Sequence, residues 1–202
     1  MKRLEGQIAF ILEIDQLKRV LRQTLVTDQS RRENSAEHSW HLAMMAPLLA
    51  EYAAEPADVD RVVRMLLVHD LVEIDAGDTF AYDATANIDR TKRERAAADR
   101  LFGPVTGAQG GLLPPEQGAE LRALWEEFER GESCDARYAN ALDRLQPLLH
   151  NWKTDGGTWR IHGVRREQVL RRMEPIRLNM PRLWPMVLAI VEEAQGKGWI
   201  EE

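Results

Sequence analysis

The sequence of 202 residues has a single cysteine, Cys134. An intrachain disulfide is therefore impossible, and this sparse use of cysteine predicts a reducing, cytoplasmic location. No run of apolar residues approaches the length of about eighteen that a transmembrane helix needs, so no membrane span is expected. The first twenty residues, MKRLEGQIAFILEIDQLKRV, carry acids inside their apolar stretch and no small-residue cleavage site, which argues against a signal peptide.

The sequence also lacks a surplus of basic residues. Its formal net charge is −6, whereas a protein that binds nucleic acid over its whole surface usually carries a positive excess. Local basic clusters do occur, at Lys18, Arg19 and Arg22 and at Arg31 and Arg32. Such clusters suit a small anionic ligand as well as they suit a solvated helix face. We therefore expect a small-molecule substrate as the partner, with no nucleic acid and no membrane.

Strict alternation of apolar and polar residues is nearly absent, and no hairpin signal of the Asn-Gly type is present. Apolar residues recur instead with helical spacing, which predicts an all-α bundle of about six to eight helices without a substantial sheet. At this length one domain covering residues 1–202 is expected. Helices are predicted at residues 4–21, 34–52, 58–75, 90–102, 115–130, 135–152, 164–180 and 181–196, with loops at 27–34, at 103–118 and in the segment TDGGTWRIHG.

Local signals set some of the predicted helix ends. Asn34 can accept a hydrogen bond from the amide three residues on, and Glu37 can reach back, which is a capping-box arrangement. Gly77 is a plausible stop for the helix predicted at residues 58–75. In the first helix, Ile8, Ile11 and Leu12 are among the expected core residues.

The helix that begins at Asn34 carries a histidine on an apolar face. His38, Leu42, Met45 and Leu49 are spaced by four, three and four residues, so they share one side of the helix. His38 should therefore point toward the core, where its polar atoms need a hydrogen bond or a ligand. Taken alone, a core histidine is more often structural than a metal ligand.

The next helix ends in the apolar run MLLVHDLVEI, which holds His69, Asp70 and Glu73. Acidic residues on a face directed at the core are costly unless they are paired or bind a metal. Neighbours such as His69 and Asp70 diverge by about 100° on a regular helix, yet their side chains can still converge on one ion. Glu73 lies one turn further on and is either a catalytic acid or base or a hydrogen-bond partner of a ligand.

A third segment, NALDRLQPLLH, places Asp143 beside an apolar stripe, on the same side as Gln146 and His150. Alternatively, Asp143 is a surface carboxylate that pairs with a nearby arginine. For His150, two positions are open, in the lining of a pocket or facing solvent. Two histidines and two carboxylates would make a mixed nitrogen and oxygen site. Such a site suits Mn²⁺, Fe²⁺, Co²⁺ or Mg²⁺ and does not exclude Zn²⁺ or Ni²⁺.

The segments AEHSWH, LLVHDLVEIDAGD and ALDRLQP resemble the HD-domain superfamily of metal-dependent phosphohydrolases. The resemblance implies an all-α fold with one divalent metal ion on His38, His69, Asp70 and Asp143. It places the motif-bearing core at about residues 17–150 and leaves residues 164–196 predicted only as C-terminal helices.

Within this superfamily the chain is most similar to the YfbR-like and HDDC2-like 5′-deoxynucleotidases, from about Leu17 to Pro147. That similarity implies hydrolysis of deoxyribonucleoside 5′-monophosphates, catalytic roles for Glu73 and Asp78, and a homodimer. The YfbR-like enzymes carry an Arg-Trp pair before the first metal histidine, where this sequence reads LKRVLRQT without tryptophan. Arg22 and Arg19 are the candidates to bind the phosphate. Because the tryptophan is missing, the sequence does not predict whether deoxyribonucleotides or ribonucleotides are preferred.

Two other functions are compatible with these motifs. One is a different HD-type hydrolysis, of a nucleoside triphosphate, a cyclic nucleotide or an alarmone. Glu73 is followed by Ile74 and not by a second acid, which disfavours the alarmone reaction. The other is a non-catalytic regulator that binds metal or nucleotide, and the presence of both Glu73 and Asp78 argues against it.

Overall fold

The structure is a computed structural model that describes residues 2–82, 88–103 and 111–202. These residues are mainly helical, with one small antiparallel pair of strands, which confirms the all-α prediction. None of the described helices is long and apolar enough to cross a membrane. In chain order the elements are α1 (Lys2–Ile14), η1 (Asp15–Arg19), β1 (Leu21–Leu25), β2 (Arg32–Asn34), α2 (Ser35–Leu49), η2 (Ala50–Tyr52), α3 (Val59–Val68), α4 (Glu73–Ala76), α5 (Arg90–Leu101), α6 (Pro115–Arg130), α7 (Cys134–Lys153), α8 (Gly157–Ile161), α9 (Arg166–Arg172), α10 (Glu174–Asn179), η3 (Pro181–Leu183) and α11 (Trp184–Gly196).

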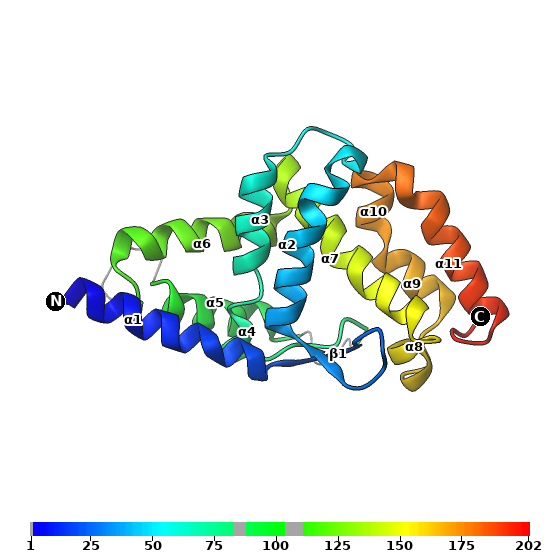
Figure 1. Cartoon of the computed structure of the whole chain (residues 1–202), viewed down its shortest axis with the longest axis horizontal. Coiled ribbons are helices and arrows are strands. Elements are labelled where there is room, and N and C mark those ends of the chain that lie inside the picture. The colour runs from blue at the N-terminus through cyan, green and yellow to red at the C-terminus, as the bar shows by residue number, and fades with distance from the viewer. Residues whose placement is uncertain (1, 83–87, 104–110) are drawn as a thin grey trace.

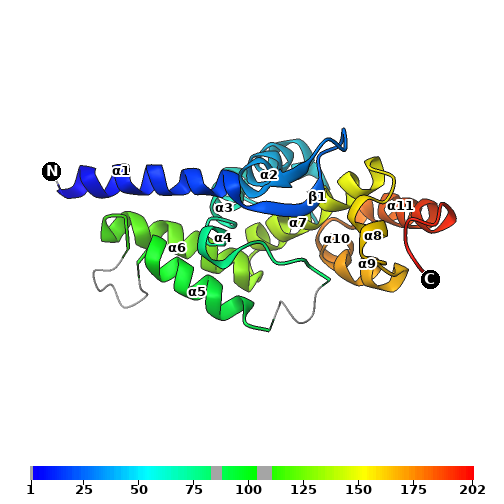
Figure 2. The same cartoon turned by 90° about the horizontal axis from the view of Figure 1, so that it is seen from below.

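Helices α2, α3 and α7 form the centre of the molecule and pack against one another (Figure 1). Helices α1, α5 and α6 extend to one end, whereas α8 to α11 lie at the other end, so the two termini are far apart (Figure 1). The second view shows α5 and α6 on the same side of α1 (Figure 2). The three central helices bring together the segments that carry His38, His69 and Asp143.

Helix α2 begins as the sequence predicts. The Asn34 side chain accepts a hydrogen bond from the Glu37 amide at 3.0 Å, and the Glu37 carboxylate accepts one from the Asn34 amide at 3.2 Å. A cap of this kind stabilises a helix by about 1 kcal/mol. The buried side of α2 includes His38, Leu42 and Met45, so the histidine faces the core as predicted.

The single helix predicted at residues 58–75 is wrong, because the regular helix α3 ends at Val68 and α4 begins only at Glu73. The intervening turn is held by hydrogen bonds between residues three apart, from the Leu71 amide to Val68 and from the Glu73 amide to Asp70. His69, Asp70 and Glu73 are all buried, at 4%, 7% and 6% exposure. Leaving the regular helix thus lets adjacent residues face the interior together. Gly77 does end α4, with a φ of 74° that favours glycine.

A two-stranded hairpin occupies part of the segment predicted as a loop. Its turn uses Gln29 at a φ of 62°, and the Asp28 carboxylate accepts hydrogen bonds from the amide and hydroxyl of Ser30. Asp28 thus supplies the turn chemistry that Asn-Gly provides in commoner hairpins. Strand β1 packs against α7, which places Arg22 next to the central helices.

Three further expectations need correction. The segment TDGGTWRIHG holds the short helix α8, and the helix predicted at 164–180 divides into α9 and α10, where Pro175 lacks the amide that a continuous helix needs. Ile8, Ile11 and Leu12 are 47%, 58% and 66% exposed, so this face of α1 is not core. Residues 104–110 of the loop predicted at 103–118 lie outside the described residues.

Candidate metal centre

Three buried side chains from different elements converge at the centre of the molecule. His38 lies in α2, His69 directly follows α3, and Asp143 lies in α7. One nitrogen or oxygen atom of each lies within 4.8 Å of the others. The Nε2 atoms of His38 and His69 are 2.9 and 3.9 Å from Oδ1 of Asp143. With exposures of 0%, 4% and 7%, these groups are shielded from solvent.

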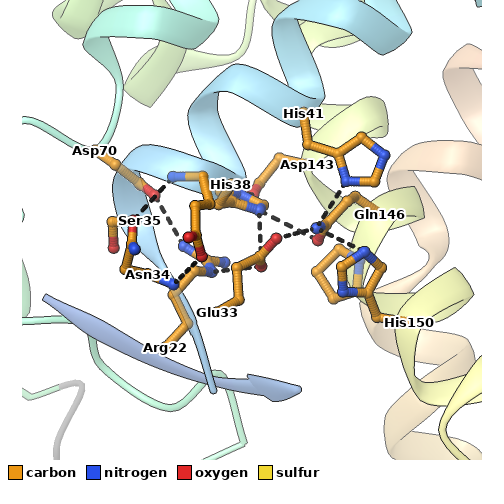
Figure 3. A network of polar contacts seen from close by, with 12 residues as sticks. Arg22, Glu33, Asn34, Ser35, His38, His41, Asp70, Asp143, Gln146 and His150 are labelled. Atoms are coloured by element: carbon orange, nitrogen blue, oxygen red, sulfur yellow. Dashed lines mark hydrogen bonds and ion pairs between the residues drawn. The ribbon is translucent and has the colours of Figure 1, made fainter. Parts of the chain in front are cut away.

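The hydrogen-bond partners of the two Nδ1 atoms leave both Nε2 atoms directed at the Asp143 carboxylate. Nδ1 of His69 lies 2.8 Å from the carbonyl oxygen of Leu66, an acceptor, so Nδ1 carries the proton. Nδ1 of His38 faces Oε1 of Gln146 at 3.2 Å in the same way (Figure 3). Among the described residues, Nε2 of His69 is buried without a hydrogen-bond partner. A divalent cation fits this position, because it would satisfy an otherwise orphaned nitrogen beside a carboxylate.

Asp70 lies at the edge of this group. Its Oδ1 atom is 3.0 Å from Nε2 of His69, and its Oδ2 atom accepts a hydrogen bond from Nη1 of Arg22 at 2.8 Å. Burial raises the pKa of Asp70, but the facing His69 and Arg22 outweigh it and hold the pKa well below its usual range. The four residues expected to bind metal therefore lie together, with Asp70 shared between the cluster and Arg22.

The same carboxylates favour the protonated form of the unliganded histidines. Burial lowers the pKa of His69, but the negative charges of Asp70 and Asp143 outweigh burial and raise it to about 9. The pKa of Asp143 is held well below its usual range by Arg144 and His38 against the effect of burial. A cation that binds here must displace protons from the imidazoles.

Glu73 and Asp78 line a cavity that also contains His69, Asp70 and Asp143. Burial, followed by the charge of Asp70, raises the pKa of Glu73 well above its usual range. Burial also raises the pKa of Asp78, and Asp70 adds to this shift while Arg22 opposes it. The Glu73 carboxylate accepts a hydrogen bond from the Ser35 hydroxyl at 2.5 Å. Two acids of raised pKa beside a cation site are typical of proton transfer in catalysis.

The two arginines expected to bind phosphate lie in different places. Arg22 lines the cavity, with Nη1 3.7 Å from Asp78 in addition to its contact with Asp70. Arg19 is exposed and contacts Gln16 at 3.1 Å, so the structure does not bring it to the site. Sequence reasoning missed the other arginines of the cavity wall. These are Arg90, Arg144 and Arg172.

Glu33 and Gln146 were also missed as parts of the site. Nε2 of Gln146 lies 2.6 Å from Glu33, 3.1 Å from Nε2 of His150 and 3.4 Å from Nδ1 of His41 (Figure 3). His150 is 5% exposed and Nδ1 contacts the carbonyl oxygen of Leu25 at 3.0 Å, so a role in solvent is wrong. The placement of Gln146 beside Asp143 on one helix face was the available signal. Its amide links His38 to this second cluster of ligand-type side chains.

Comparisons with known proteins identify the family of the chain. A family model described as HD domain matches residues 14–184. The chain is 31% identical over 143 residues to the human 5′-deoxynucleotidase HDDC2, a match that covers 70% of this chain and 65% of that protein. The chain thus spans slightly less than two thirds of this relative.

Solved structures extend the likeness over nearly the whole chain. A protein from Magnetospirillum magnetotacticum MS-1, described as a predicted metal-dependent phosphohydrolase, is 55% identical with a TM-score of 0.90, covering 100% of this chain and 97% of that one. A conserved hypothetical protein from Pyrococcus furiosus is 20% identical with a TM-score of 0.62, over 93% of this chain and 98% of its own. The second likeness concerns the fold alone.

Proposed function

The chain belongs to the HD domain family, and from this premise we propose that it is a metal-dependent 5′-nucleotidase. Its substrates would be deoxyribonucleoside or ribonucleoside 5′-monophosphates, and its products nucleoside and phosphate. The observation that carries the proposal is the convergence of His38, His69 and Asp143, of which His69 and Asp143 line a cavity together with Glu73 and Asp78. The activity named for the human relative supports the same substrate class.

In this proposal one divalent ion is held by His38, His69, Asp70 and Asp143. A divalent ion supplies positive charge to the phosphoryl oxygens and makes a nearby water more acidic. Phosphate monoester hydrolysis is among the slowest uncatalysed reactions, and one general acid or base contributes only about 10²–10⁴-fold. Charge stabilisation by the cation and by Arg22 must therefore contribute most of the acceleration.

Glu73 and Asp78 divide the proton transfers between them. Glu73 is the more deeply buried acid and has the more strongly raised pKa, so it is suited to hold a proton for the leaving 5′ oxygen. Asp78 lies near the Arg22 guanidinium, whose charge favours the carboxylate form and suits it to accept a proton from water. Arg22 would also orient the phosphate, because its Nη1 atom lies in the cavity at 2.8 Å from Asp70 and 3.7 Å from Asp78.

The decisive experiment measures phosphate release from a panel of substrates. Purified protein is loaded with Mn²⁺ or Co²⁺ and incubated with deoxyribonucleoside and ribonucleoside 5′-monophosphates, with nucleoside triphosphates and cyclic nucleotides as comparison substrates. We expect release from the monophosphates that stops when the metal is chelated. Folded, metal-loaded protein that releases phosphate from no monophosphate would refute the proposal.

We also propose a cytoplasmic homodimer. The single cysteine supports a reducing compartment. On α2, Trp40, Met44 and Leu48 follow one another at intervals of four residues and are 62%, 49% and 70% exposed. An apolar row of this kind is suited to cover the same row on a second copy. Light scattering on the purified protein would give the mass, and a monomer at micromolar concentration would contradict the dimer.

A further inference from the structure

One part of the cavity wall carries two neighbouring arginines. Arg144 comes from α7, directly after Asp143, and Arg172 is the last residue of α9. Both line the cavity that His69, Asp70 and Asp143 also line. The positive charge of Arg144 disfavours the charge on Arg172. The Tyr82 side chain lies beside this pair and interacts with both guanidinium groups.

Three of the cavity's arginines have carboxylate partners. Arg22 contacts Asp70, and Nε of Arg90 is 2.6 Å from Glu94. The Arg144 guanidinium contacts the Asp143 carboxylate. These charges are therefore balanced within the protein. Arg22, Arg90 and Arg144 thus neutralise acidic side chains of the protein itself.

Arg172 differs from these three. Within the described part of the chain its guanidinium makes no hydrogen bond and has no carboxylate within ion-pair distance. Burial and the charge of Arg144 lower the pKa of Arg172 to about 10, and the charge of Asp143 compensates only in part. A half-buried guanidinium without a partner destabilises the folded protein, so an anion that binds beside it would stabilise this charge.

The position of this charge separates it from the metal centre. Arg144, Arg172, Ala81 and Tyr82 also line an adjoining cavity, and none of the four candidate metal ligands borders it. A phosphoryl group held at His38, His69 and Asp143 would therefore leave the Arg172 side of the cavity for another part of the same molecule. Guanidinium groups bind phosphate oxygens through paired, charge-assisted hydrogen bonds.

We propose that Arg172, assisted by Arg144, forms a subsite for a second phosphate of the substrate, apart from the phosphoryl group that is hydrolysed. The preferred substrates are then nucleotides with two phosphates, either on separate positions of the sugar or in a 5′-diphosphate. This inference rests on the proposed function and extends its substrates to nucleotides with a second phosphate. Nucleoside monophosphates remain substrates but use only the metal side of the cavity.

The test compares deoxyadenosine 5′-monophosphate with deoxyadenosine 3′,5′-bisphosphate and deoxyadenosine 5′-diphosphate, using the Mn²⁺-loaded protein. KM is measured for each compound that is hydrolysed, and equilibrium dialysis gives Kd for each that is not. We expect at least one doubly phosphorylated compound to bind about tenfold to a hundredfold more tightly than the monophosphate, since charge-assisted hydrogen bonds have strengths in that range. Arg172→Gln should remove this advantage and change monophosphate binding by less than about twofold.

Arg177→Gln is the matched control, because it removes one positive charge from the neighbouring helix α10, where Arg177 is exposed and pairs with Glu174. It should retain the advantage of the doubly phosphorylated compound. Arg172→Lys should restore part of it, since lysine keeps the charge without the paired donors. Thermal unfolding checks the fold, and Arg172→Gln should be at least as stable as the wild type because an unpartnered charge is removed.

Equal binding of all three compounds by the wild type, or equal losses in Arg172→Gln and Arg177→Gln, would overturn the subsite. Failure of the nucleotidase proposal would look different. The protein would then release no phosphate from the monophosphate, while dialysis would still detect a doubly phosphorylated compound whose binding depends on Arg172.

Discussion

Two clusters of histidine and carboxylate side chains lie on either side of Gln146. They differ in whether a hydrogen-bond donor of the protein already lies among the ligand atoms. Each offers three ligand atoms within 4.8 Å of one another, from His38, His69 and Asp143 in one cluster and from Glu33, His41 and His150 in the other. In the second cluster the amide nitrogen of Gln146, a donor, already lies at that point. In the first, Nε2 of His69 has no hydrogen-bond partner among the described residues.

The two clusters also differ in the pKa shifts of their histidines. Asp70 and Asp143 raise the pKa of His69, so the unliganded first cluster attracts positive charge. In the second cluster, burial and the neighbouring His150 lower the pKa of His41, which keeps that imidazole neutral. The residue types alone would predict two metal sites. Hydrogen bonds and charge favour the first cluster as the cation site and a supporting role for the second.

The sharpest way to break this comparison is to remove one histidine from each cluster. His69→Ala should lower kcat/KM for a nucleoside monophosphate by about a thousandfold or more, because charge stabilisation by the cation contributes several kcal/mol. His150→Ala should cost about tenfold at most, through the position of Gln146. Equal losses in the two variants, with folding checked by circular dichroism, would show that the clusters do not differ as described.

Replacing an acid that does not bind the cation should lower the catalytic rate without lowering the metal content. Glu73→Gln and Asp78→Asn should each reduce kcat by about 10²–10⁴-fold, the range for general acid or base catalysis. Their metal content, measured by elemental analysis, should remain that of the wild type. A variant that loses metal together with activity would instead place the changed carboxylate among the ligands.

Gln146 links the two clusters, and its replacement should weaken the first without removing it. In Gln146→Leu, Nδ1 of His38 loses the acceptor at 3.2 Å and Glu33 loses the donor at 2.6 Å. We expect metal affinity to fall by about 10–100-fold, as for other groups that orient a ligand. Competition with a fluorescent chelator measures the affinity. Unchanged affinity would mean that Gln146 does not orient His38.

The pH dependence of metal binding should reflect the raised pKa of His69. Because this pKa is about 9 without the cation, the imidazole is protonated below pH 9 and a cation must displace its proton. Metal affinity should therefore rise by about tenfold per pH unit between pH 6 and 8 and level off near pH 9. Chelator competition at several pH values checks this. An affinity that does not change over this range would contradict a protonated His69.

Local signals in the sequence were enough to predict much of the fold. Asn34 and Glu37 form the predicted capping box, and the spacing from His38 to Met45 correctly placed the histidine on the buried side of α2. The break after Val68 was not predictable in this way, because a turn of hydrogen bonds three residues apart keeps nearly the same apolar spacing as an α-helix.

The substrate side of the site depends on contacts between distant parts of the chain. Arg172 lies on a helix predicted only as a C-terminal element, and nothing near it in the sequence indicates that it lines the same cavity as Arg22 and Arg144. Arg19 and Arg22 looked equivalent in sequence, yet only Arg22 lies on the strand that packs against α7. Tertiary packing decides which arginines reach the cavity.

The metal content of matched variants tests the central claim most directly. Wild type, His69→Ala and His150→Ala would be purified, stripped with a chelator, reloaded with Mn²⁺ or Co²⁺ and analysed for metal per folded chain. We predict about one ion per chain for the wild type and for His150→Ala, and almost none for His69→Ala. An ion retained by His69→Ala but lost by His150→Ala would place the metal in the second cluster and contradict the account.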